Sequence, residues 1–218
     1  MMTDRNRGDI VKVVHGYHSI KIKGSYPIKQ LKDIQIVQEI NNHFTMHLSG
    51  ILQEEEAENF IYKVSSEDAI EVALQEDSEI VIFSGIPTAI NLKSVHGINY
   101  IALNCKSCTY NMDVSQCSRS FQDKKMTFDQ LIEFIVSGYE DGYFINTAAS
   151  EKKIGKIRVQ YKETDWEFLK RIASSEETVL VPDISIAKSR FWFGMPKSKK
   201  TIEVDPQESL SFAQKNET

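Results

Sequence analysis

The stretch VQYKETDWEFLKRIASSEETVLVPD, residues 159–183, combines an apolar strand, a charged turn and an aromatic-rich helix in one short run. Its turn, residues 163–167, carries three carboxylates and could be mistaken for an active site. Thr164 followed three residues later by Glu167 is a capping box, in which each side chain accepts a hydrogen bond from a backbone N–H of the other residue. Asp165 would lie at the positive end of the helix dipole. The carboxylates are therefore predicted to start a helix and to have no catalytic role.

The helix that begins there has a continuous apolar face. Trp166, Phe168, Leu169 and Ile172 recur at helical spacing, which predicts that the helix packs tightly against a sheet. Trp166 and Phe168 are expected in the core.

A second helix is predicted over residues 128–136, with Gly138 as a plausible stop. Thr127 and Gln130 form its capping box. Its apolar stripe consists of Phe128, Leu131, Ile132 and Ile135.

The first half of the chain has the pattern of β-strands. Apolar and polar residues alternate at 19–24 and 43–48, so each run should bury one face and expose the other. Further strands are predicted at 59–64, 79–86, 98–104, 156–161, 178–182 and 190–193, several of them bounded by turn residues such as Pro87. The fold class predicted from these elements is a mixed, β-rich α+β fold with an antiparallel barrel or sandwich.

Composition excludes several classes of protein. The 218 residues carry a net charge of -5, which argues against a general nucleic-acid binder. No apolar run is long enough to span a membrane. The N-terminus lacks the apolar core of a secretory signal, so synthesis in a cytoplasm is expected. The odd number of cysteines, three, is more typical of free thiols than of a disulfide framework.

No pattern in the sequence predicts a catalytic residue, a metal site or a cofactor. Cys105, Cys108 and Cys117 lack the second ligand pair of a zinc site. His43 and His47 are expected on the polar face of a strand, in contact with water and without a carboxylate partner. The acidic run at 54–58 is interpreted as a solvated loop. No nucleophile elbow, phosphate-binding loop or HExxH motif occurs, so no motif in the sequence indicates an enzyme.

Three segments carry a resemblance to a known family. SRSFQDKKMTFDQLIEFIV at 118–136 and the stretch at 159–183, preceded by the strand IVIFSGIPTAINL at 80–92, resemble the VgrG and phage late control D family in content and order. The resemblance implies a baseplate hub protein of contractile tails and type VI secretion, with antiparallel β-barrel subdomains and a small α/β insertion carrying two short helices. It also implies a homotrimer that adapts the tail tube to the spike, without catalytic residues or cofactor.

The family's recurring positions map onto eight residues of this chain, which belong to two short motif words. Arg119, Phe121 and Asp123 match one word, and an Arg119–Asp123 pair across the turn is our hypothesis. The second word is matched by Tyr161, Glu163, Asp165, Phe168 and Arg171. Arg171 is expected to pair with a carboxylate, Glu163 or Asp165. Thr164 and Trp166 complete the set of structural residues.

The resemblance also predicts how the chain is divided. We expect a first β-barrel subdomain over 1–112, an α/β segment with two helices over 113–177, and strands over 178–218 that complete a barrel or begin a shortened second one, with a frayed tail. Family members continue beyond this point, so the chain is expected to be either a shortened hub protein or a fragment of one. The alternative function is a tail-associated module that degrades or binds the cell wall.

Overall fold

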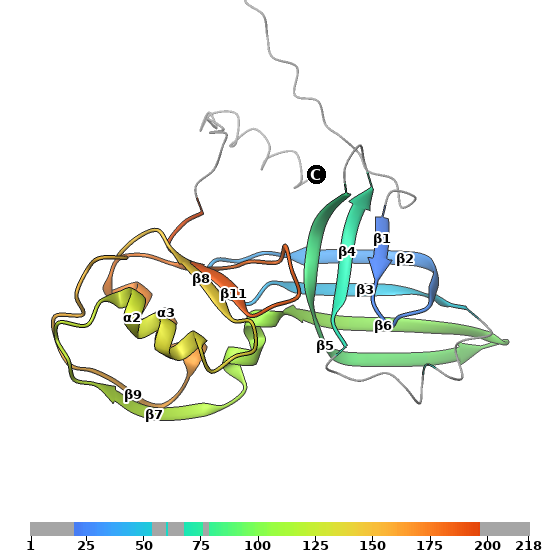
Figure 1. Ribbon diagram of the computed structural model, residues 1–218. Coiled ribbons are helices and arrows are strands. Elements are labelled where there is room, and N and C mark those ends of the chain that lie inside the picture. Colours follow the sequence, from blue (N-terminus) through green and yellow to red (C-terminus); the bar gives the residue numbers. More distant parts are fainter. Residues whose placement is uncertain (1–19, 54–59, 61–67, 76–78, 197–218) are drawn as a thin grey trace, which may run out of the picture.

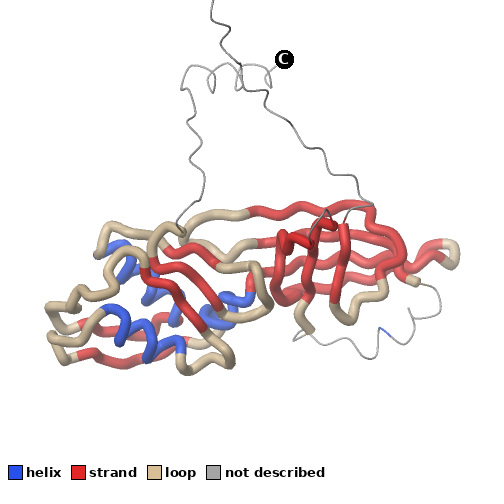
Figure 2. The backbone as a smooth tube through the Cα atoms, turned by 45° about the horizontal axis from the view of Figure 1, so that its top comes forward, coloured by secondary structure: helices blue, strands red, loops and turns tan. Residues whose placement is uncertain are grey.

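The computed structural model describes residues 20–53, 60, 68–75 and 79–196. These residues form two lobes that lie side by side in an elongated molecule (Figure 1). We call residues 20–107 the sheet lobe and residues 108–196 the α/β lobe. Figure 2 shows that the described helices all lie in the α/β lobe, whereas the sheet lobe is built of strands.

The sheet lobe is one six-stranded antiparallel sheet, curled into a half-barrel. Its strands lie in the order β1-β4-β5-β6-β3-β2. Their bounds are β1 Ile20–Lys23, β2 Ile28–Val37, β3 Thr45–Leu52, β4 Ile70–Gln75, β5 Glu79–Val95 and β6 Ile98–Ser107. Strands β1 and β2, adjacent in sequence, are therefore the two edges of the sheet.

The concave face of this sheet holds the first hydrophobic core. Along β3, Met46, Leu48 and Leu52 are buried while Thr45 and His47 are exposed, which is the predicted alternation. The core is completed by residues from three other strands and from the segments between strands, among them Tyr26, Phe44, Phe60, Ile70, Val72, Phe83, Ile101 and Leu103. The expected strand at 59–64 lies outside the described residues except for Phe60, and the acidic run at 54–58 lies wholly outside them.

Strand β5 corrects one boundary predicted from the sequence. Pro87 was expected to end a strand, but β5 continues through it to Val95. The register of β5 on β6 shifts between Pro87 and Ala89, a bulge at which the missing N–H of proline is tolerated. Gly85 is required nearby, because a Cβ there would lie 2.2 Å from the carbonyl oxygen of Lys106. The strand is thus about twice as long as the alternating pattern at 79–86 predicted.

The α/β lobe contains two helices, a 3-10 helix and five strands. In chain order these are η2 Cys108–Asp113, β7 Gln116–Phe121, α2 Phe128–Val136, β8 Tyr143–Asn146, β9 Arg158–Thr164, α3 Asp165–Ser175, β10 Leu180–Pro182 and β11 Arg190–Phe193. Strands β7 and β9 form an antiparallel two-stranded sheet. Strands β10, β11 and β8 form a second sheet, in which β8 runs parallel to β11.

Both helices pack into a second hydrophobic core. It contains the predicted stripe of α2, the apolar face of α3, and Leu180, Phe191 and Phe193 from the last two strands. The strands expected at 178–182 and 190–193 are present, but they pair with each other and with β8 and do not extend the six-stranded sheet. Helix packing explains this, since β10 and β11 cover the apolar sides of α2 and α3. The predicted boundaries at 112 and 177 stay a prediction.

Candidate functional site: the start of helix α3

The capping box at the start of α3 is formed as predicted. The backbone N–H of Glu167 donates to Oγ1 of Thr164 at 3.1 Å, and the backbone N–H of Thr164 donates to Oε2 of Glu167 at 2.9 Å. Helix α2 has the matching arrangement between Thr127 and Gln130. Both helices therefore begin where the sequence predicts, because each cap satisfies N–H groups that the helix itself leaves unpaired.

Asp165 is the buried centre of a polar cluster. Its side chain accepts hydrogen bonds from Arg119 Nη2 at 2.5 Å, from Tyr139 OH at 2.7 Å and from Gln160 Nε2 at 2.9 Å. These donors come from β7, from the loop after α2 and from β9. Burial raises the pKa of the Tyr139 phenol above its ordinary value, and the hydrogen bond to Asp165 raises it further. Asp165 thus ties three elements to the first turn of α3.

The hypothesis that Arg119 pairs with Asp123 is wrong. Arg119 lies on the inner face of β7 and reaches the start of α3, where Asp165 offers a charged acceptor in a buried setting. Asp123 instead accepts from the backbone N–H of Lys125, two residues further on, at 2.9 Å, and so stabilises the turn before α2.

Arg171 pairs with Glu163, one of the two predicted partners. Its Nε and Nη2 donate to the two carboxylate oxygens of Glu163 at 3.1 and 2.7 Å. Nη2 also donates to the backbone carbonyl of Val159 at 2.6 Å. The guanidinium lies over the ring of Phe168, 5.1 Å from its centroid. These hydrogen bonds from the Arg171 guanidinium hold α3 against the strand that precedes it.

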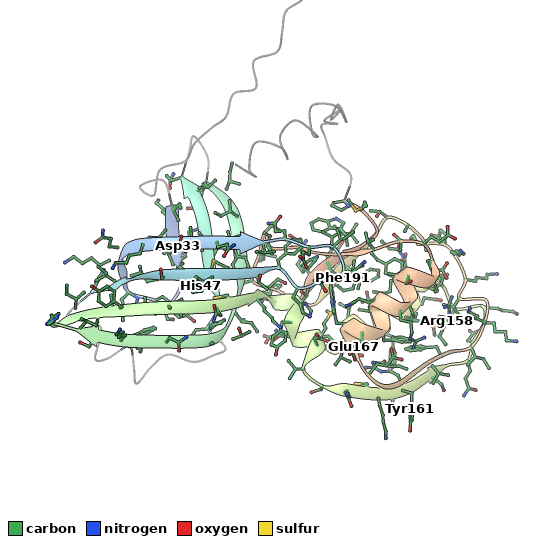
Figure 3. The ribbon with its side chains drawn as sticks, turned by 180° about the vertical axis from the view of Figure 1, so that it is seen from behind. Asp33, His47, Arg158, Tyr161, Glu167 and Phe191 are labelled. Carbon is green, nitrogen blue, oxygen red and sulfur yellow. The ribbon has the colours of Figure 1, made fainter. Side chains whose placement is uncertain are left out.

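The two aromatic residues predicted for the core are there. Trp166 and Phe168 are almost fully buried. Phe168 stacks on Phe121, a residue of the other motif that lies on β7, with ring centroids 5.7 Å apart. Tyr161 differs from its neighbours in the motif, since 65% of its surface is exposed and Figure 3 shows it pointing away from the lobe.

A contact that sequence reasoning missed joins Trp166 to the sheet lobe. Its Nε1 donates to the backbone carbonyl of Asn41, in the loop between β2 and β3, at 3.3 Å. Asn41 also bonds Leu180 twice, through its backbone N–H at 2.8 Å and its Oδ1 at 2.9 Å. Its φ of 66° lies in the left-handed region, which asparagine tolerates better than most residues. The only signal in the sequence was an asparagine in a polar loop.

The prediction that His43 is exposed to water and lacks a carboxylate partner is wrong. Its side chain is 7% exposed, and it contacts Oγ1 of Thr109 at 2.9 Å and Oδ2 of Asp113 at 3.2 Å. Asp113 accepts from the hydroxyl of Thr164 at 2.5 Å, so the contacts lead from His43 to the cap of α3. Burial lowers the pKa of His43 to about 4, although Asp113 acts in the opposite direction.

His43 is buried because it precedes β3 and therefore escapes the alternation of the strand. It packs on Trp166, with ring centroids 4.7 Å apart. His47, within β3, does follow the alternation, since it is exposed and contacts Asn104. The start of α3, His43 and Asn41 together form what we call the lobe joint.

The remaining candidates for chemistry are buried or dispersed. Cys105 and Cys108 are buried free thiols, and burial raises the pKa of Cys108 to about 11. Within the described ranges, no group of three or more histidine, cysteine, aspartate or glutamate side chains could hold a metal ion. No helix in those ranges is both long and apolar enough to cross a lipid bilayer.

Comparison with known proteins yields matches in structure and none in sequence. Neither a protein-family model nor a curated protein matches the chain. Three solved structures each align with 80% of it. They are a tail protein of Neisseria meningitidis (13% identity, TM-score 0.58), a type VI secretion component of E. coli described as similar to T4 bacteriophage tail proteins (16%, 0.58), and a 43 kDa prophage MuSo2 tail protein of Shewanella oneidensis (14%, 0.60).

The chain corresponds to only part of each of these proteins. The chain spans about half of these proteins, 49% of the first two and 52% of the third. At such low identity the likeness concerns the fold, which is the half-barrel sheet followed by a small α/β lobe. The chain therefore shares its fold with phage tail proteins and a type VI secretion component, as its sequence resemblance implies.

Proposed function

We propose that the chain is a structural component of the baseplate hub in a phage tail or related contractile injection system. In this role three copies would assemble around an axis, adapt the tail tube to the spike, and become part of the finished particle. The observation that carries the proposal is the shared fold with two tail proteins and a type VI secretion component over 80% of the chain. A role in symmetric assembly requires surfaces and rigidity, with no need for a reactive group.

The bonding at the start of α3 supports a structural role without catalysis. Each carboxylate in the 163–167 turn has a structural partner: Glu163 binds Arg171, Asp165 binds Arg119, and Glu167 caps the helix. Asp165 is nearly inaccessible to solvent. Such groups hold the α/β lobe in one conformation.

The proposal is tested by assembly of the full chain. Light scattering should give a mass of about three times 24.9 kDa for the chain alone, or a larger complex that contains three copies of the chain when tail-tube and spike proteins are co-expressed with it. Those proteins should co-purify with the chain and should be lost when the lobe joint is broken by Trp166→Ala. A chain that stays monomeric with all of these partners and that degrades or binds peptidoglycan would contradict the hub role and favour the cell-wall module.

A further inference from the structure

One edge of the two-stranded sheet in the α/β lobe is open. Among the described residues, β7 pairs only with β9, and it runs along the lower border of the lobe in Figure 1. The carbonyl of Val159 on β9 accepts from Arg171 of α3, so it points away from β7. Opposite residues of an antiparallel pair alternate together, and Ser120 is opposite Val159. Ser120 therefore directs its backbone N–H and C=O to the open edge, as does Ser118.

Exposed apolar side chains border this edge on both faces. Phe134 of α2 is 57% exposed, although its ring makes an edge-to-face contact with Phe121 of β7. On the other face, Val159 and Tyr161 stand opposite Ser120 and Ser118, and both are exposed. The two serines are small, so a neighbouring strand could bring larger side chains over them into contact with Val159 and Tyr161.

A hollow of about 480 Å³ adjoins the same place. It lies over the outer surface of α2, and its lining includes Glu133, Phe134, Ser137 and Phe144. Phe134 borders both this hollow and β7. An open strand edge beside a side-chain pocket is the arrangement by which proteins bind extended segments: backbone bonds supply affinity and the pocket accepts alternate side chains.

The end of β7 carries a concentration of positive charge in a chain that is acidic as a whole. The backbone N–H of Gly155 donates to the carbonyl of Lys124, which brings the loop at 151–156 against the loop at 122–126. The two loops hold five lysines and two acidic residues. Four of these lysines are exposed and form no ion pair with any described residue: Lys124, Lys125, Lys153 and Lys156.

Charge complementarity decides between the candidate occupants of this edge. A second copy of the chain would bring the same lysines, and Asp113, the carboxylate just before its β7, is already engaged by His43 and Thr164. A partner segment with acidic residues beside an apolar run would satisfy both the lysines and the apolar borders.

We propose that β7 is a strand-addition site for an extended segment of another protein, in which acidic residues precede an alternating apolar run. The segment adds antiparallel to β7, with its acidic end at the lysines and apolar side chains on Phe134 and on Val159. The site is independent of the hub role, because it lies on the α/β lobe and requires no trimer.

Fluorescein-labelled peptides test the proposal by fluorescence anisotropy with the full chain. One has three glutamates before six residues of alternating valine and threonine, and a second has the same residues with the glutamates last. Antiparallel addition predicts that the glutamate-first peptide binds more tightly, that its affinity falls with added salt, and that a lysine-first version binds weakly.

A matched pair of variants isolates the strand edge. Ser120→Pro removes an N–H that points away from β9, so the β7–β9 pairing is kept, whereas Ser120→Ala retains that N–H. We expect affinity about tenfold lower for Ser120→Pro and unchanged for Ser120→Ala, with near-ultraviolet circular dichroism verifying that both fold. Phe134→Ala should also weaken binding.

Three results would overturn the proposal. They are equal affinity for the two peptide orders, binding that survives Ser120→Pro undiminished, and self-association of the full chain that Ser120→Pro abolishes. The last result would assign the edge to a second copy. None of the three bears on whether the chain co-purifies with tube and spike proteins, so the hub proposal and this one can fail separately.

Discussion

Trp166 on α3 and Asn41 before β3 lie 125 positions apart in the chain, yet the indole N–H of one donates to the backbone carbonyl of the other. The same asparagine pairs with Leu180 through backbone and side chain. One residue of the sheet lobe therefore contacts two elements of the α/β lobe, and both contacts depend on a backbone conformation that few residues adopt readily.

Removing the Trp166 side chain should weaken the contact between the two lobes and lower the stability of the chain. Trp166→Ala is expected to lower the free energy of unfolding by about 3–5 kcal/mol, because it deletes a large buried side chain and leaves a cavity at the joint. Urea denaturation monitored by circular dichroism measures the change in unfolding free energy. Tyr161→Ala is the control on the same motif, and its exposed ring should change stability by about 0.5 kcal/mol or less. Similar losses for the two variants would contradict the buried role of Trp166.

The two helix caps allow a direct comparison. Thr127→Ala and Thr164→Ala each remove an N-cap, which should cost about 0.5–2 kcal/mol. Thr164→Ala should be the more damaging of the two, because the Thr164 hydroxyl also donates to Asp113 and so supports His43. Equal midpoints in urea would show that the bond from Thr164 to Asp113 contributes nothing measurable.

Asp165→Asn tests the polar cluster. It replaces a charged acceptor that serves Arg119, Tyr139 and Gln160, and it leaves the guanidinium without a counter-charge, so a loss of about 1.5–3 kcal/mol is expected. The double variant with Arg119→Met should recover part of that loss, since the two changes act on one contact. If the losses simply add, Arg119 and Asp165 are not energetically coupled.

His43 should make stability depend on pH. Its pKa is about 4 in the folded chain and 6.5 ordinarily, so between these values the unfolded chain binds a proton that the folded chain does not. The contribution is fully present above pH 6.5 and is lost as the pH falls toward 4, with a total on the order of 3 kcal/mol.

The measurement is urea unfolding at a series of pH values between those limits. The groups that act on His43 are Asp113, Lys106 and Lys170, and carboxylates elsewhere also titrate at the lower end. The difference between the wild-type chain and His43→Gln isolates the histidine. If the difference in unfolding free energy stays constant across the series, the pKa of His43 is not lowered in the folded chain.

The sequence predicts the parts of this structure that depend on neighbours in the chain. Both capping boxes, the apolar faces of α2 and α3, and the pairing of Arg171 with Glu163 connect residues at most eight positions apart, and all of them are present. The family resemblance added the fold, which periodicity alone left open between a barrel and a sandwich.

What the sequence did not predict depends on distant partners. Arg119 prefers Asp165, 46 positions away, to the nearby Asp123. His43 is buried by η2 and α3, which no local pattern could indicate. Strand β2 was not predicted because two register shifts interrupt its alternation, and β8 has only four residues. For Arg119 and His43 the deciding contact is made by a segment that is remote in sequence.

The two hydrogen bonds between Asn41 and Leu180 set an order of events during synthesis. All six strands of the sheet lobe have been synthesised once Ser107 is added, but Leu180 is made 139 residues after Asn41. At about 5–20 residues per second that interval is on the order of ten seconds. The half-barrel can therefore form first and wait for its neighbour, and the loop around Asn41 stays accessible to chaperones until the last strands of the α/β lobe emerge and cover it.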